Sequence, residues 1–257
     1  MPDGLKIMVI GDPHAKPGVS NRRFTWLGRM ARDRKPDIII DIGDWNDMES
    51  LCSYDKGKQC YEGRRYIHDI EAGREARKLF DAEYKRNKKG YKPVLHSLGG
   101  NHDEGRISKT LEMEPELRGA IGFHDLAREE FGWQVTPFKQ VLQIERVSFC
   151  HFFASGVMGR PMGGEHPAAT MIKKLFVSAI AGHSHLLAFS TRTNGFGEKL
   201  CAAQVGCYMD PDQYEDYAGP QVNEMWRSGI AMLNNVQGSS FDFEWVDIER
   251  IAEKYGD

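Results

Sequence analysis

The chain lacks the features that mark membrane-spanning and exported proteins. No stretch of its 257 residues approaches the roughly 18 consecutive apolar residues that cross a bilayer. The N-terminus has neither the basic start nor the long apolar core of a signal peptide. The five cysteines are an odd number without a Cys-x-x-Cys pair, which indicates reduced thiols, although a Cys52–Cys60 disulfide stays open. We therefore expect a cytoplasmic protein without a membrane partner.

The chain also lacks a strong charge of either sign. Its 34 Lys and Arg against 37 Asp and Glu give a formal net charge of −3, which argues against wholesale wrapping of nucleic acid but leaves room for a local basic face. Apolar residues make up 40% and charged residues 28%, as in ordinary globular proteins. We find no internal repeat, low-complexity tract or linker, so we expect a single domain over residues 1–257.

Apolar runs and helical patterns alternate in the first half of the chain. The apolar runs at 5–12, 37–44 and 92–100 each end at or next to glycine, which is typical of buried strands that lead into loops. Helical patterns occupy the two intervals between them, at 20–36 and 62–90. Strand, helix and strand at this spacing predict βαβ units with parallel strands.

The second half of the chain is richer in strand patterns. Helical segments are predicted only at 124–131 and 168–176. Strands are predicted within 140–153, around a turn at Glu145-Arg146, and at 177–185, 186–193, 199–208, 229–236 and 241–249, the last as an edge strand. Early βα units and late hairpins together predict an α/β fold of two sheets with helices outside.

Several predicted strands end in side chains that bind metals. These are Asp12 and His14, then Asp44, then Asn101 and His102, then His151, and finally His183 and His185. Ligands of α/β proteins gather at the carboxyl ends of strands. Imidazole, carboxylate and amide groups suit divalent Mn, Fe, Co, Ni or Zn. A carboxylate between two such groups can bridge two ions, which activate a water and neutralise phosphoryl oxygens.

Each of these pieces alone has an ordinary structural explanation. Asp12-Pro13 is a common turn start, and Gly43-Asp44 is a weak signal. A histidine within an apolar run, as at His151, is more often a hydrogen-bonded core residue. The metal interpretation therefore rests on all five pieces occurring in one order, each at the end of a strand.

In that order, the motifs resemble those of the calcineurin-like metallophosphoesterase superfamily. The family pattern of Asp-x-His, Gly-Asp, Gly-Asn-His-Asp/Glu, His and Gly-His-x-His matches residues 12–14, 43–44, 100–103, 151 and 182–185. The resemblance spans residues 7 to 185 and implies a four-layer α/β/β/α sandwich of two mixed sheets with flanking helices. The length and the late motifs also resemble the small phosphoesterases encoded by bacteriophages.

The resemblance implies a role for each of these residues. Asp12, His14 and His185 hold one metal, Asn101, His151 and His183 hold a second, and Asp44 bridges them. His102 stays outside the metal shell, where it protonates the leaving oxygen or stabilises the phosphoryl charge. Asp103 accepts a hydrogen bond from His102 and orients it. The implied cofactors are two divalent ions, foremost Mn, with Fe, Zn, Co and Ni as alternatives.

Three further residues are candidate substrate contacts: Trp45, Arg106 and His166. Trp45 directly follows Asp44 and either forms a wall for a base or belongs to the core, which is the interpretation that we favour. His166 lies in the glycine-rich loop 156–167 and is either a substrate contact or a solvated loop residue.

The sequence indicates the type of reaction more clearly than it indicates which phosphate ester is the substrate. Asp103 stands where protein phosphatases of this family more often have Glu. Residues 51–92, within a predicted helical basic insertion near 50–92, carry twelve Lys or Arg against seven Asp or Glu. Such a surface either follows a nucleic-acid backbone or is a solvated helix face.

We favour a phosphodiesterase or nuclease acting on DNA or RNA. The first alternative is a phosphomonoesterase acting on nucleotides or phosphoproteins. The second is a non-catalytic scaffold of the same fold, which would have no need to keep every ligand.

Overall fold

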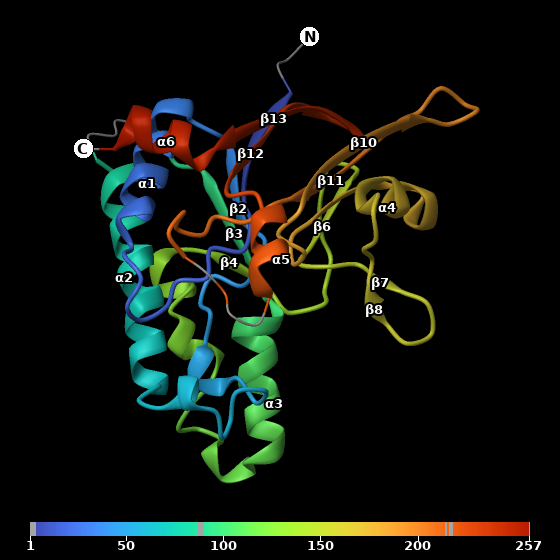
Figure 1. The fold of residues 1–257 in the computed structure, drawn as a ribbon. Coiled ribbons are helices and arrows are strands. Elements are labelled where there is room, and N and C mark those ends of the chain that lie inside the picture. The colour runs from blue at the N-terminus through green and yellow to red at the C-terminus, as the bar shows by residue number, and fades with distance from the viewer. Residues whose placement is uncertain (1–3, 87–89, 214, 216–217, 257) are drawn as a thin grey trace.

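Two β-sheets form the centre of the molecule, which the computed structural model describes for residues 4–86, 90–213, 215 and 218–256 (Figure 1). The six-stranded sheet has the order β13-β12-β1-β2-β3-β4, and the five-stranded sheet has the order β10-β11-β9-β6-β5. The first sheet comprises β1 (Leu5–Ile10), β2 (Ile38–Asp41), β3 (Val94–Leu98), β4 (Gln134–Thr136), β12 (Gly229–Gln237) and β13 (Ser240–Asp247). The second comprises β5 (Leu142–Ile144), β6 (Val147–Cys150), β9 (Ser178–Ala181), β10 (Leu187–Thr193) and β11 (Lys199–Val205). A separate hairpin joins β7 (Ala154–Ser155) and β8 (Arg160–Pro161).

Helices cover the outer faces of both sheets (Figure 1). On the six-stranded sheet lie α1 (Arg22–Arg34), α2 (Tyr66–Tyr84) and α6 (Ile248–Tyr255), and on the five-stranded sheet lies α4 (Pro167–Leu175). Two further helices, α3 (Arg106–Met113) and α5 (Gly219–Met225), lie outside these layers. Short 3-10 turns occupy Glu49–Leu51, Gln59–Tyr61, Pro115–Leu117, Phe123–Leu126 and Glu129–Phe131, and a π-helical turn occupies Asn101–Gly105. None of the described helices combines the length and apolar character that a bilayer crossing requires.

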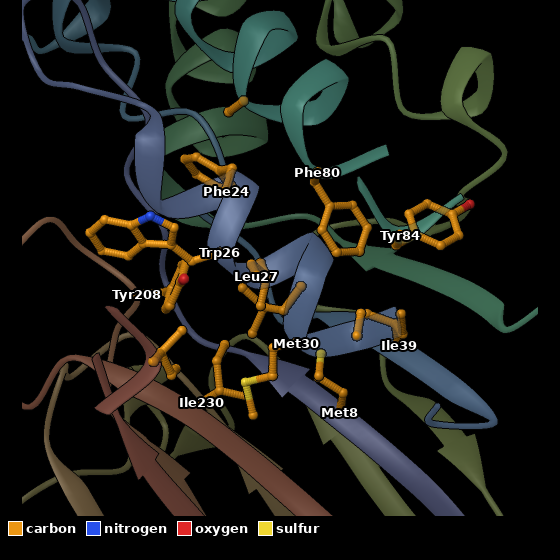
Figure 2. Close-up of a cluster of buried hydrophobic side chains, with 14 of the residues drawn as sticks. Met8, Phe24, Trp26, Leu27, Met30, Ile39, Phe80, Tyr84, Tyr208 and Ile230 are labelled. Atoms are coloured by element: carbon orange, nitrogen blue, oxygen red, sulfur yellow. The ribbon is translucent and has the colours of Figure 1, made fainter. Parts of the chain in front are cut away.

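Three clusters of buried side chains hold the four layers together. Phe24 of α1 and Ile39 of β2 belong to one cluster between the helices and the six-stranded sheet (Figure 2). Ile40, the next residue of β2, points to the opposite face and packs in the cluster that contains Phe149 of β6, between the two sheets. Met171 of α4 belongs to a third cluster on the outer face of the five-stranded sheet. The predicted four-layer α/β/β/α sandwich is therefore confirmed.

Both sheets are mixed, with parallel strands at their centres. β1, β2, β3 and β4 run parallel to one another, and β12 joins β1 antiparallel. In the second sheet β9 runs parallel to both β6 and β11, while β5 and β10 are antiparallel edge strands. Strands that are buried on both faces read as continuous apolar runs, as β2 does. The carboxyl ends of these parallel strands meet at one end of the sandwich.

Most predicted elements are confirmed, and the departures are local. The segment 124–131 is not a helix but contributes to two short 3-10 turns. Helices α3, α5 and α6 and the short strands β4, β7 and β8 were not predicted, and α6 follows β13 without an intervening loop. The predicted edge strand at 241–249 is β13, at the edge of its sheet. All five cysteines are free thiols.

The basic segment near 50–92 contains helix α2 and, after it, the basic run at 85–89. Its helix α2 is the crossover between β2 and β3 and packs along α1. On α2, the buried Arg77 contacts Asp41 at 3.2 Å and Arg74 forms a bidentate pair with Glu130. The basic run at 85–89 lies partly outside the described residues. The positive charge of α2 is thus largely paired within the fold.

Candidate metal centre and active site

The predicted ligands converge where strands of both sheets end. Asp12 and His14 follow β1, Asp44 follows β2, Asn101 follows β3, His151 follows β6, and His183 and His185 follow β9. Five of the seven are buried, and the other two, Asn101 and His183, are partly exposed. The structure therefore brings all seven together at the carboxyl ends of parallel strands, the common location of ligand sites in α/β proteins.

The backbone is strained at most of these positions. Left-handed φ values occur at five of the seven: Asp12 (35°), His14 (45°), Asp44 (54°), His183 (69°) and His185 (58°). Each such conformation costs a non-glycine residue about 1–3 kcal/mol. Strain of this kind persists only where the surrounding structure enforces it, and it concentrates at functional sites.

Two glycines allow the strand ends to approach the carboxylates closely. A Cβ atom on Gly100 would lie 2.0 Å from Oδ1 of Asp44, and one on Gly182 would lie 2.3 Å from Oδ2 of Asp12. Any larger residue would displace a carboxylate from the centre. This contact explains why glycine precedes Asn101 and His183.

The first group of ligands consists of Asp12, His14 and His185. The Nε2 atoms of His14 and His185 lie 3.2 Å apart, and Oδ1 of Asp12 lies 3.9 Å from Nε2 of His185. Nδ1 of His14 lies 3.2 Å from Oδ1 of Asp47. Because an ionised carboxylate only accepts hydrogen bonds, His14 donates from Nδ1 and its Nε2 lone pair points inward.

The second group consists of Asp44, Asn101, His151 and His183. Nδ1 of His151 donates to the backbone oxygen of Ile42 at 3.2 Å, so its Nε2 is the nitrogen that faces the centre. That nitrogen lies 3.3 Å from Oδ2 of Asp44 and 2.8 Å from Oδ1 of Asn101. Nδ1 of His183 lies 2.7 Å from the same Asn101 oxygen.

These groups fit two divalent ions with Asp44 between them. Oδ2 of Asp44 lies 3.9 Å from Nε2 of His14 and 3.3 Å from Nε2 of His151, one from each group. The ligand atoms within Asp12, His14 and His185, and those within Asp44, His151 and His183, lie within 4.8 Å of one another. Inward lone pairs at such distances repel unless a cation lies among them, and this mixed nitrogen and oxygen set suits borderline divalent metals.

The protonation equilibria of the protein alone point the same way. Burial lowers the pKa of His183 to about 4 and holds the pKa of His185 well below its ordinary value, so both imidazoles are neutral, the form that binds metal. Burial raises the pKa of Asp12 to about 7. For His151 burial lowers the pKa, but the negative charge of Asp44 outweighs it and raises the pKa to about 9. The carboxylates thus attract positive charge to the centre.

His102 lies beside the metal groups, with a ring nitrogen within 4.8 Å of ligand atoms of His14 and Asp44, and its carboxylate partner differs from the predicted one. Its Nδ1 lies 2.6 Å from Oδ1 of Asp47, and its backbone N–H donates to Oδ1 of Asp44 at 2.8 Å. Among the described residues, the Asp103 carboxylate makes no hydrogen bond to this ring. The structure therefore corrects the prediction that Asp103 orients His102.

Asp103 instead closes the turn to which it belongs. Its Oδ1 accepts the backbone N–H groups of Gly100 at 2.7 Å and Glu104 at 2.6 Å, within the π-helical turn that starts at Asn101. Burial raises the pKa of this carboxyl to about 6. Neighbours in sequence on such a turn point in different directions, which is why adjacency to His102 was misleading.

Asp47 is the functional residue that motif reasoning missed. Its Oδ1 accepts from Nδ1 of both His14 and His102, and its backbone oxygen accepts from Arg106 at 2.7 Å. One carboxylate thereby orients a candidate metal ligand and the candidate proton donor together. The only signal in the sequence was an acidic residue three positions after Asp44 in the same loop.

The three candidate substrate contacts lie in different surroundings. Trp45 is fully buried in the core cluster and its Nε1 donates to the backbone oxygen of Gly73 at 3.2 Å, so it is a core residue, as we favoured, and offers no exposed face to a substrate. Arg106 lines the cavity beside His102. His166 is exposed at the start of α4 and is not among the described residues that line this cavity.

A cavity of about 790 Å³ opens from the metal groups toward solvent. Its inner end is lined by Asp47, Asn101 and His102. Its remaining lining comes from the segment 49–64, the start of α3, Phe138, Lys139, Phe152 and Glu215. The cavity is therefore much larger than a phosphoryl group requires.

The sequence model of the calcineurin-like phosphoesterase family matches residues 5–187 of this chain. The chain belongs to that family. It is therefore a hydrolase that acts on phosphoester bonds, in a family that depends on two metal ions, and the groups described above are its candidate metal ligands. A comparison with curated proteins finds no match.

Two solved structures are similar to this calcineurin-like phosphoesterase at low identity. One is an uncharacterised protein from Streptococcus pneumoniae, described as a predicted phosphoesterase, at 13% identity over 97% of this chain and 92% of that chain, with a TM-score of 0.40. The other is a phosphoesterase from E. coli, at 12% identity over 95% of this chain and 100% of that chain, with a TM-score of 0.44. Because both TM-scores are low, the family assignment rests on the sequence match.

Proposed function

We propose that the protein is a dinuclear-metal phosphodiesterase, with DNA or RNA as the favoured substrates and Mn as the favoured metal. The observation that carries this proposal is the cavity of about 790 Å³, which continues beyond His102 and Asn101. A diester carries an organic group on each side of its phosphorus, and the cavity offers room for both. A simple monoester needs only its inner end.

The candidate ligands fall into two groups, one for each metal ion. The ions would be held by Asp12, His14 and His185 on one side and by Asn101, His151 and His183 on the other, with Asp44 shared. Bound there, the two ions supply an activated water and neutralise charge on the phosphoryl oxygens. The protein's own contribution is to fix these side chains, which it does through strained backbone and buried hydrogen bonds.

His102 is positioned to hold and release the proton that the leaving oxygen takes up. Asp47 engages its Nδ1, which leaves Nε2 as the nitrogen that can face the substrate. Burial lowers the pKa of His102, opposed by the negative charge of Asp44. A lowered pKa makes the protonated ring a stronger acid, which favours transfer to the departing oxygen.

A nucleic acid would contact the protein along the cavity rather than along α2. Helix α2, which the sequence suggested as a basic surface, has its arginines paired with Asp41 and Glu130. The cavity instead carries Lys109 of α3 and Lys139, neither of which pairs with a carboxylate among the described residues. Contact along the cavity brings the backbone of a polynucleotide to the metal groups, which contact along α2 does not.

The test is hydrolysis of matched substrates with added Mn²⁺. Bis-p-nitrophenyl phosphate, p-nitrophenyl phosphate, single-stranded DNA and double-stranded DNA are compared side by side. We expect faster turnover of the diesters, and activity on the monoester alone would overturn the proposal. The Asp44→Ala protein, purified in parallel, serves as the control for contaminating enzymes.

A further inference from the structure

We propose that two aromatic and lysine pairs in the cavity, Tyr54 with Lys109 and Phe138 with Lys139, bind bases and phosphates of single-stranded nucleic acid. This inference rests on the proposed phosphodiesterase function and names its substrate class. All four residues line the same cavity as His102. Each pair offers a flat ring for a base beside an ammonium group for a phosphate.

The first pair lies on the outer part of the cavity. The side chain of Tyr54 is 82% exposed, an unusual position for a large ring. The Nζ atom of Lys109 lies 5.2 Å from the centre of this ring and donates to Oγ of Ser53 at 2.8 Å. The hydroxyl and the ring hold the lysine in place, and the ring remains accessible for stacking.

The second pair lies next to the metal groups. The Phe138 ring is 6.1 Å from the ring of His151 and 5.7 Å from that of Phe152, which in turn lies 5.0 Å from His183. The Nζ atom of Lys139 is 5.2 Å from the centre of Phe138. Lys139 has a left-handed backbone with φ 67° in the turn that the backbone N–H of Gln140 closes on the oxygen of Pro137 at 3.0 Å.

The charges in the cavity single out these two lysines. Lys58 and Arg64 both pair with Asp55, at 3.0 and 2.8 Å, so their charge is compensated. Within the described part of the chain, neither Lys109 nor Lys139 has a carboxylate partner. Uncompensated ammonium groups are the ones that attract phosphates.

The pairs favour a single strand over a duplex or a phosphopeptide. Bases of a duplex are stacked on one another and do not present a face to Tyr54 or Phe138, whereas unpaired bases do. A phosphopeptide has no planar group at every backbone repeat. Two pairs of ring and ammonium group in one cavity suit a chain that repeats base and phosphate.

The test measures both binding and turnover of a ten-residue thymidine oligonucleotide. Binding of the fluorescein-labelled oligonucleotide is followed by anisotropy on His102→Ala protein with Mn²⁺, which prevents cleavage. We expect Tyr54→Ala to weaken binding roughly five- to a hundredfold and Tyr54→Phe to restore it. Lys109→Gln and Lys139→Gln should each lower the slope of log affinity against log salt by about 0.7.

Turnover provides the matched control. In the otherwise native protein, the same substitutions should raise KM for the oligonucleotide and leave kcat/KM for bis-p-nitrophenyl phosphate within about twofold of wild type. If the protein hydrolyses diesters but Tyr54→Ala does not weaken oligonucleotide binding, this inference is overturned and the proposed function is not. Binding that depends on Tyr54, without hydrolysis of any diester, would overturn the proposed function and leave the binding inference standing.

Discussion

The inner and outer parts of the active-site cavity are built in different ways. At the inner end, seven side chains from the ends of strands are held by strained backbone, buried hydrogen bonds and close glycine contacts. At the outer end, the segment 49–64 has short 3-10 turns and exposed side chains such as Tyr54. The difference teaches that the chemistry depends on the rigid sandwich, whereas the choice of substrate depends on loops that the core does not fix.

The substitution with the largest expected effect removes the shared carboxylate. Asp44→Ala should lower kcat by about a thousandfold or more, because both ions lose a ligand and several kcal/mol of charge stabilisation disappear with them. Metal content by mass spectrometry, beside kcat, checks this result. A variant that kept two ions per chain and near-normal turnover would show that Asp44 is not shared.

Removal of the candidate proton donor separates acid catalysis from metal binding. His102→Ala should lower kcat by about 10²- to 10⁴-fold and leave the metal content unchanged. Loss of metal in this variant, with His151→Ala retaining it, would mean that the two histidines have exchanged roles.

A matched pair of carboxylates tests the corrected orientation of His102. Asp47→Asn should lower kcat/KM about 10- to 100-fold, since the amide disturbs the rings of both His14 and His102. Asp103→Asn should change it less than tenfold, because the new amide oxygen can still accept the backbone N–H groups. The reverse order of effects would restore Asp103 as the orienting residue.

The smallest effect on catalysis is expected from a substitution of Trp45, in the core next to the metal groups. Trp45→Phe should lower the free energy of unfolding by about 1–3 kcal/mol, because the smaller ring leaves a void in a buried cluster. Its KM for diesters should stay within about twofold of wild type. Urea denaturation and steady-state kinetics measure the two quantities, and a raised KM with unchanged stability would return Trp45 to the substrate site.

The sequence predicted the four layers and the seven clustered residues because both follow from local patterns. Apolar runs define the strands, and the parallel order brings their carboxyl ends together, so motif residues at strand ends must meet. The orientation of His102 could not be predicted in this way. Whether Asp47 or Asp103 faces the ring depends on the path of a π-helical turn, and the motif gives no information on that path.

Other features depended on tertiary packing. Helix α6 follows β13 directly, with no glycine or proline to mark the boundary, so its pattern merged with that of the strand. The basic pattern of α2 suggested an interaction surface, but Asp41 and Glu130 pair with its arginines from distant parts of the chain. The cavity itself is lined by the segment 49–64 and by the start of α3, which lie far apart in the sequence.

The most direct test of the central claim is the metal stoichiometry and spin coupling of Mn²⁺-loaded protein, measured by mass spectrometry and electron paramagnetic resonance. With Asp44 shared between the two ligand groups, the account predicts two ions per chain with an exchange-coupled spectrum, and loss of that coupling in Asp44→Ala. A single ion per chain, or two ions without coupling, would contradict it.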